Sequence, residues 1–181
     1  MQSLRETGVC RGCDLAGADL NGMDLRAVDM SEADLRAARC VASDLRGAKL
    51  AAADLRGADL TEAYLCNVRL NGANLSEARL DRAILGGEEC IPATMNRAVL
   101  IRASMVGTRL CGVSLLRADL SGANLTDADL SESDLTAAIL RKAQLSGTNF
   151  QDVDLTTTTL AQANISAAKN VFLKYPRLDA R

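Results

Sequence analysis

The residues best suited to chemistry in this chain are its six cysteines and its aspartates. Cys10-x-x-Cys13 has the spacing of half a zinc site or of a redox pair, but no second pair with matching spacing follows it. Histidine is absent, which removes the commonest general base and metal ligand. No phosphate-binding glycine loop, GxSxG or metalloprotease signature occurs. We therefore predict that the protein is not an enzyme and needs no cofactor or metal.

The aspartates belong to a five-residue repeat that runs through most of the chain. From Cys10 to Ile165, the 32 positions numbered by multiples of five are all apolar, and Leu fills 24 of them. Two residues earlier the chain has Ala at 19 of these positions, and one residue earlier Asp or Asn at 16. The unit reads A-D/N-L-x-x, as in Ala18-Asp19-Leu20-Asn21-Gly22. Asp thus has a regular structural place, which argues against paired catalytic carboxylates.

A period of five fits neither a plain helix nor a flat strand. On a helix the Leu row would spiral around all sides, and on a strand alternate Leu would face opposite ways. One inward Leu in every five residues requires the chain to bend once per repeat. The small residue two places before each Leu then shares the interior, and the remaining positions face water.

These units resemble the A(D/N)LXX units of the pentapeptide-repeat family. The resemblance implies an all-β fold, a right-handed quadrilateral parallel β-helix with twenty residues per coil and about eight coils. Residues twenty apart would then stack in inward columns. One expected column is Leu15, Leu35, Leu55, Leu75, Met95, Leu115, Leu135 and Leu155. Another is Cys10, Met30, Leu50, Leu70, Cys90, Leu110, Leu130 and Phe150.

The repeat also predicts the organisation of the chain. We expect an N-terminal cap over 1–9, the β-helix over 10–165 with an irregular segment at 86–94, and a C-terminal cap or tail over 166–181. That last segment is the most aromatic part of the chain. It is a candidate lid and, since some family members dimerise through this end, a candidate homodimer surface. Its candidate residues are Val171, Phe172, Leu173 and Tyr175.

The irregular segment contains Gly86-Gly87-Glu88-Glu89-Cys90-Ile91-Pro92. Glu88 occupies an inward position, where an unpaired carboxylate is costly to bury. Either the coil bulges outward here or Glu88 turns to solvent. The Leu register resumes in phase at Met95, so we expect no residues to be gained or lost from the coil.

The repeat also predicts where each cysteine lies. Cys10, Cys13, Cys40 and Cys90 occupy inward positions, while Cys66 and Cys111 lie outward on different faces. We interpret all six as unpaired thiols, which suits a reducing compartment. With no membrane-length apolar run, we expect a soluble cytoplasmic protein without membrane insertion.

Several apolar residues occupy outward positions around the middle coils, Ile91 among them. An apolar patch rimmed by Arg is typical of a protein-binding site. The candidate patch comprises Arg82, Ile84, Val99, Ile101, Arg102 and Val106, expected on two adjoining faces. We therefore predict an interaction scaffold whose partner is another protein.

Two alternatives stay open. Members of the Qnr-like branch of the family bind DNA gyrase and topoisomerase IV and are thought to imitate DNA. The net charge of −2 and the Leu-centred repeats argue against that function here, and against direct nucleic-acid binding. A structural subunit of a larger assembly is the other alternative.

Overall fold

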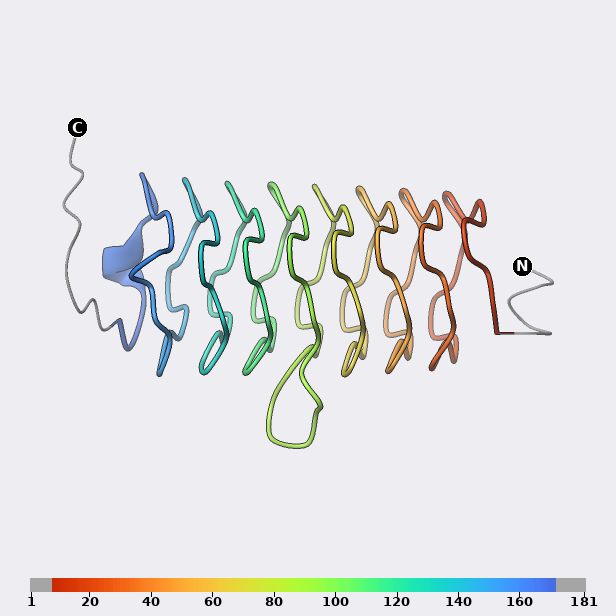
Figure 1. Ribbon diagram of the computed structural model, residues 1–181, viewed down its shortest axis with the longest axis horizontal. Helices are drawn as coiled ribbons and strands as arrows, with labels where there is room; N and C mark the ends of the chain where they lie inside the picture. Colours follow the sequence, from red (N-terminus) through yellow and green to blue (C-terminus); the bar gives the residue numbers. More distant parts are fainter. Residues whose placement is uncertain (1–7, 172–181) are drawn as a thin grey trace.

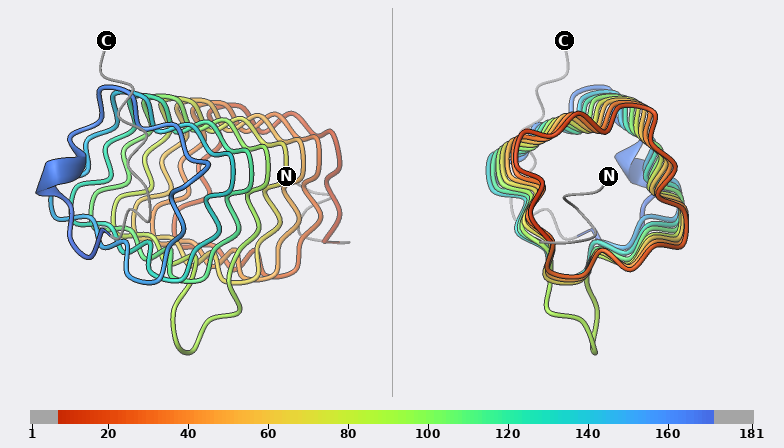
Figure 2. Two further views of the ribbon diagram at one scale, coloured as in Figure 1. Left: turned by 60° about the vertical axis from the view of Figure 1, so that its left-hand side comes forward. Right: turned by 90° about the vertical axis from the view of Figure 1, so that its right-hand side faces the viewer.

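The computed structural model describes residues 8–171, which form a rod of stacked coils (Figures 1 and 2). The coils are joined by single-residue parallel β-bridges rather than by long strands. Successive bridges join residues twenty apart, such as Asp14 to Asp34 and Asp34 to Asp54. Four such columns begin at Val9, Asp14, Asp19 and Asp24, so each coil has four sides. The architecture is therefore a parallel β-helix solenoid.

Each repeat bends the chain through a tight turn. After an inward residue such as Leu15, the chain turns so that the Ala18 amide donates to the Leu15 carbonyl oxygen at 3.0 Å. The second residue after the inward position has a positive φ, as at Gly17 (65°) and Ala37 (54°). A type II turn requires a positive φ at this place. One left-handed residue in nearly every repeat thus makes the corner that the five-residue period predicts.

The interior is filled by the Leu and Ala positions of the repeat. Leu75, Ala78 and Leu80 all have 0% exposure. Backbone hydrogen bonds tie each coil to the next, as where the Leu15 amide donates to the Asp34 carbonyl oxygen at 2.7 Å. The inward positions predicted from the repeat are confirmed over most of the rod.

The expectation that the irregular segment neither adds nor removes residues was wrong. Across it, bridges join residues 25 apart, such as Asn74 to Val99. The Ala93 amide donates to the Leu85 carbonyl oxygen at 2.8 Å, so residues 86–92 replace the two residues of an ordinary corner. They form the loop that projects from the rod in Figure 1. Because the loop adds five residues, inward residues still recur every five positions. The residues that stack across the loop, however, are 25 apart and not 20.

The predicted inward columns are therefore correct on either side of the loop but not across it. The Leu75 amide donates to the carbonyl oxygen of Val99, which places Leu75 under Leu100 rather than under Met95. Met95 instead follows Leu70, whose amide donates to the Thr94 carbonyl oxygen. Cys90 has left the core and lies in the loop.

At the C-terminal end the rod finishes with a short 3-10 helix, η1 (Ile165–Ala167). Val171 is half-buried and packs against the core. Phe172, Leu173 and Tyr175 lie outside the described residues, so the predicted lid and self-association surface stay predictions. Within residues 8–171, no helix has the length and apolarity needed to cross a membrane.

Candidate interaction surface

Four of the six residues predicted as a docking patch lie close together. Ile101 and Arg102 form one corner of a coil, and Val106 begins the next corner of the same coil. Arg82 occupies that second corner in the preceding coil, and its amide donates to the Val106 carbonyl oxygen at 2.9 Å. Ser104 lies on the side between these two corners and forms a bridge there.

Ile84 and Val99 do not share a side with each other, so the expectation of two adjoining faces was wrong. Ile84 bridges Tyr64 and Arg109, whereas Val99 bridges Asn74 and Asp119. These two columns lie on opposite sides of the four-sided coil. The cause is the five-residue insertion, which turns every later residue by one side relative to a twenty-residue spacing.

The predicted patch is also less exposed than its outward register suggests. Ile84, Val99, Ile101 and Val106 are half-buried, because the neighbouring coils lie directly above and below them. Arg82 and Arg102 are exposed. They pair with Glu62 at 3.6 Å and with Glu77 at 3.8 Å. Exposed ion pairs of this kind contribute little stability, so a partner can replace them at little cost. Because both arginine side chains are exposed, their guanidinium groups are accessible to a partner.

The largest irregularity of the surface is the projecting loop, residues 86–92. Glu88 and Glu89 at its tip are exposed, as the outward-bulge alternative predicted. Gly86 is required at the base of the loop, because a Cβ there would collide with the Cys111 carbonyl oxygen. The ring of Pro92 lies on the Gly112 side of the same corner. The loop thus leaves and rejoins the rod against the following coil.

Exposed apolar residues gather beside this loop. Ile91 is 68% exposed and Tyr64 is 47% exposed, and Tyr64 bridges the half-buried Ile84. The Ile91 carbonyl oxygen accepts the Asn67 amide at 2.6 Å, which holds Ile91 at the corner next to Tyr64. We call Tyr64, Ile84 and Ile91 the loop-base surface. Tyr64 was missed from the sequence, although an aromatic residue at a position usually held by Asp or Asn was a usable signal.

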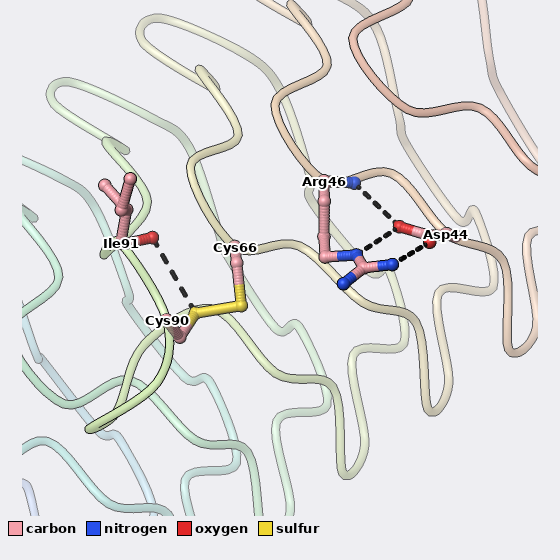
Figure 3. The surroundings of a disulfide bond; sticks show 5 residues. All are labelled: Asp44, Arg46, Cys66, Cys90 and Ile91. Atoms are coloured by element: carbon pink, nitrogen blue, oxygen red, sulfur yellow. Dashed lines mark hydrogen bonds and ion pairs between the residues drawn. A yellow bond between two sulfur atoms is a disulfide. The ribbon is translucent and has the colours of Figure 1, made fainter.

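A disulfide joins the loop to the preceding coil (Figure 3). Cys66 lies at the corner below the loop and Cys90 lies on its returning arm, with 5.3 Å between their Cα atoms. The bond spans 24 residues of sequence. In the chain-entropy model, closing a loop of that length stabilises the folded state by about 3–4 kcal/mol.

The interpretation of all six cysteines as unpaired was therefore wrong. Cys10 and Cys13 form a second disulfide, since the corner turn brings two inward positions three residues apart to a Cα separation of 5.3 Å. Cys40 and Cys111 are free. Burial raises the pKa of the Cys40 thiol to about 12, as expected for an inward cysteine. The case for a reducing compartment rested on unpaired thiols and loses that support, so the cytoplasmic location stays a prediction.

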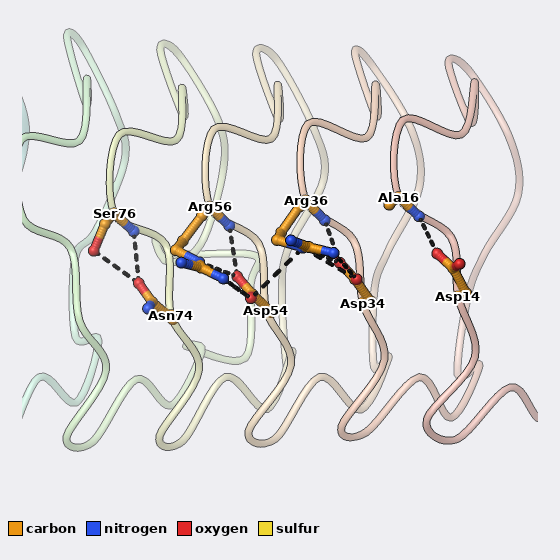
Figure 4. A network of polar contacts seen from close by, with 8 residues as sticks. All are labelled: Asp14, Ala16, Asp34, Arg36, Asp54, Arg56, Asn74 and Ser76. Atoms are coloured by element: carbon orange, nitrogen blue, oxygen red, sulfur yellow. Dashed lines mark hydrogen bonds and ion pairs between the residues drawn. The ribbon is translucent and has the colours of Figure 1, made fainter.

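The aspartates of the first coils form ladders with arginines (Figure 4). Asp34 Oδ1 accepts the Arg36 backbone amide at 3.1 Å and the Arg36 Nε at 2.8 Å. Asp54 and Arg56 repeat this arrangement one coil further on. The side-chain and backbone hydrogen bonds from Arg36 lower the pKa of Asp34 to about 2. These carboxylates stabilise corners and are neutralised by cations, which fits the structural role predicted for them.

This geometry predicts the effect of removing one arginine. Replacing Arg36 with Ala should raise the pKa of Asp34 from about 2 towards 3.8, though not fully, because the backbone hydrogen bond remains. A carboxylate with a lowered folded-state pKa contributes stability above its unfolded pKa and loses it as pH falls through the folded value. The variant should therefore lose less stability than the parent as pH falls from 4 to about 2.

Carboxyl chemical shifts followed by NMR would measure this pKa. The matched control is Arg46→Ala, since Arg46 pairs with Asp44 instead. An unchanged Asp34 titration in the Arg36 variant, or an equal shift in the Arg46 variant, would contradict the assignment.

The described residues contain no group of three or more Cys, Asp or Glu side chains placed to hold a metal ion. An open hollow lies on another side of the coils, lined by Asp24, Arg26, Asp44 and Arg46, which are already paired, and by Tyr64. This hollow adjoins the loop-base surface through Tyr64. The chemistry that the surface offers is therefore apolar contact and charge pairing.

Comparison with known proteins agrees with the repeat and the fold. The family model for pentapeptide repeats matches residues 9–39, 48–87, 114–152 and 138–169, with eight copies. The chain belongs to the pentapeptide-repeat family. Solved structures similar to this pentapeptide-repeat protein exist. No curated protein matches its sequence.

Three solved structures illustrate the likeness. A pentapeptide repeat protein of the Arabidopsis thaliana thylakoid lumen is 32% identical, over 66% of this chain and 69% of its own, with a TM-score of 0.39. HetL of the cyanobacterium Nostoc sp. strain PCC 7120, involved in heterocyst differentiation regulation, is 29% identical, over 90% and 94%, with a TM-score of 0.30. Full-length QnrB1, a plasmid-mediated fluoroquinolone resistance protein, is 14% identical, over 88% and 91%, with a TM-score of 0.52. At that identity the likeness to QnrB1 shows the fold alone.

Proposed function

We propose that this pentapeptide-repeat protein is a non-enzymatic scaffold that binds another protein at its loop-base surface. From family membership we also infer that its coils wind right-handed and number about eight. One observation carries the functional proposal. The projecting loop and the exposed apolar residues Tyr64 and Ile91 lie together on a rod whose core is already filled by its own Leu and Ala columns.

The composition of this surface suits a protein partner. Aromatic and aliphatic residues beside arginine are typical of the centre of a binding site. Arg109 follows Ile84 in the same column, and Arg82 and Val106 lie at the adjoining corner. We place these three residues at the rim of the proposed site. Val99, Ile101 and Arg102 lie further round the rod, so we assign them a lesser part.

The ladders argue against the DNA-mimicking alternative. Imitation of DNA requires regular unpaired negative charge. Along the first coils, however, Asp24, Asp34, Asp44 and Asp54 each pair with the Arg two residues on. The presented surface there is charge-balanced.

Two single substitutions test the proposed site, Tyr64→Asp and Ile91→Asp. Tyr64 is 47% exposed and Ile91 is 68% exposed, so each variant should keep its fold and melting temperature. Each should lose at least about tenfold in partner recovery in a pull-down, because a charge in the centre of an apolar contact removes most of its binding energy. Recovery would be quantified by mass spectrometry against the parent protein.

The matched control is Ile139→Asp, an apolar-to-acidic change in the Val99 column, on the side opposite the loop-base surface. It should retain the partner. If both loop-base variants keep every partner while folded, the binding face lies elsewhere. If both variants are still recovered in a complex of fixed stoichiometry, the protein is instead a structural subunit of that complex.

A further inference from the structure

The Cys66–Cys90 disulfide is the covalent tie between the projecting loop and the coil below it (Figure 3). The other contacts of the loop arms are backbone hydrogen bonds and the packing of Pro92 against Gly112 and of Arg109 against Gly87. The Asn67 amide donates to the Ile91 carbonyl oxygen at 2.6 Å, and the Gly86 amide donates to the Arg109 carbonyl oxygen at 3.1 Å. These bonds hold the two ends of the loop, while the disulfide holds its returning arm at Cys90.

The rod continues without interruption beneath the loop. The Ala93 amide closes the base on the Leu85 carbonyl oxygen at 2.8 Å. On either side of that corner, the Leu65 amide donates to Ile84 and the Leu70 amide donates to Thr94. None of these ladder bonds passes through residues 87–90. Opening the disulfide therefore removes the covalent hold on the loop at Cys90 and leaves the stacking of the coils in place.

The two disulfides differ in how well a reductant can reach them. Cys66 and Cys90 are both half-buried at the surface. Cys10 is 2% exposed and faces the core, although Cys13 beside it is partly accessible. Thiol–disulfide exchange requires a thiolate to reach a sulfur atom. At the loop both cysteines are therefore partly exposed, whereas in the Cys10–Cys13 bond only Cys13 is.

We propose that the Cys66–Cys90 bond is a redox latch that sets the position of the loop. A dithiol reductant attacks one sulfur as its thiolate, and a mixed disulfide forms as the Cys66–Cys90 bond breaks. The second thiol of the reductant then displaces the remaining cysteine. Two electrons pass to the protein, both cysteines end as thiols, and the reductant becomes a cyclic disulfide.

Release of the latch changes the loop-base surface. Ile91 directly follows Cys90 and adjoins Tyr64 through its bond to Asn67. Freeing Cys90 loosens the arm that positions Ile91. The release of the loop is argued from the contacts of the loop alone. Its effect on partner binding rests on the proposed function.

A Glu-specific protease reports the state of the latch without any partner. Glu88 and Glu89 lie at the loop tip, while Glu62 and Glu77 lie at corners of the rod and serve as internal controls. The protein would be digested with and without dithiothreitol, and each cut assigned by mass spectrometry. On reduction we expect cleavage after Glu88 or Glu89 to accelerate about tenfold or more, as for a segment released to open locally. Cleavage after Glu62 and Glu77 should not change.

Matched variants isolate the bond responsible. The double variant Cys66→Ser with Cys111→Ser should be cut quickly without reductant; the second change removes the free thiol of the following coil, which could otherwise pair with Cys90. The variant Cys10→Ser with Cys13→Ser should respond to dithiothreitol as the parent does. Equal loop cleavage in both redox states overturns the latch, and so does faster cleavage at every Glu, since that means the rod unfolds. No partner is present in this assay. A negative result would therefore contradict the latch and leave the proposed binding site to be tested by the pull-down.

Discussion

Leu75→Asp is expected to unfold the protein or lower its unfolding free energy by at least about 4 kcal/mol. Leu75 has 0% exposure and lies within a stacked inward column, where a carboxylate finds neither water nor a cation. The neighbouring change Asn74→Ala should cost only about 1 kcal/mol, the typical net value of a hydrogen bond. It removes Asn74 Oδ1, which accepts the Ser76 amide at 3.1 Å and the Ser76 hydroxyl at 2.7 Å.

Chemical denaturation of the three proteins would measure both losses. Leu75→Asn is the matched control, because it has nearly the shape of Asp and no charge, so it separates the cost of polarity from the cost of charge. Losses of similar size for Leu75→Asp and Asn74→Ala would mean that the inward register is incorrect at this coil.

Two five-residue deletions in the loop should differ in their effect on stability. Deleting residues 88–92 leaves Gly86 and Gly87 between Leu85 and Ala93, and a glycine then occupies the corner position that needs a positive φ. Deleting residues 86–90 leaves Ile91 and Pro92, and proline cannot adopt that conformation. Both deletions restore a twenty-residue coil. Compared with a full-length chain that also lacks the Cys66–Cys90 disulfide, the first should keep the melting temperature, and the second should lower stability by about 3 kcal/mol or more.

Both deletions remove Cys90, so they belong in a Cys66→Ser background, with Cys66→Ser itself as the reference. Thermal unfolding followed by circular dichroism would compare them. A loss of about 3 kcal/mol corresponds to a fall of roughly 6–12 °C for a domain of this size. If the two deletions melt together, the loop is not a replacement for an ordinary corner.

The five-residue pattern was enough to predict that the chain bends once in every repeat. A Leu at every fifth residue, with Ala two places before it, permits burial only if the chain bends once per repeat. The structure confirms this with inward residues such as Leu75 and Ala78, and with the left-handed corner residues that follow nearly every inward position. The structural role of Asp34 and its equivalents was predictable for the same reason, because each repeat supplies the same local hydrogen bonds.

The residues that stack on each other in neighbouring coils could be identified only from the folded chain. An insertion of five residues keeps the Leu positions at multiples of five, so this register gave no sign that Val99 stacks on Asn74. The resulting shift by one side separated Ile84 from Val99. It also brought Cys111 to the same corner as Cys66, where different faces had been expected.

The disulfides show the same division. The inward register of Cys10 and Cys13 was correct, but their bond depends on how closely the corner brings the two sulfur atoms together. Cys66 and Cys90 meet only because residues 86–92 leave the wall and return over the preceding coil. A five-residue pattern reports which way each side chain points. Contacts between coils depend on the number of residues in a whole coil, and the loop changed that number from 20 to 25 without altering the pattern.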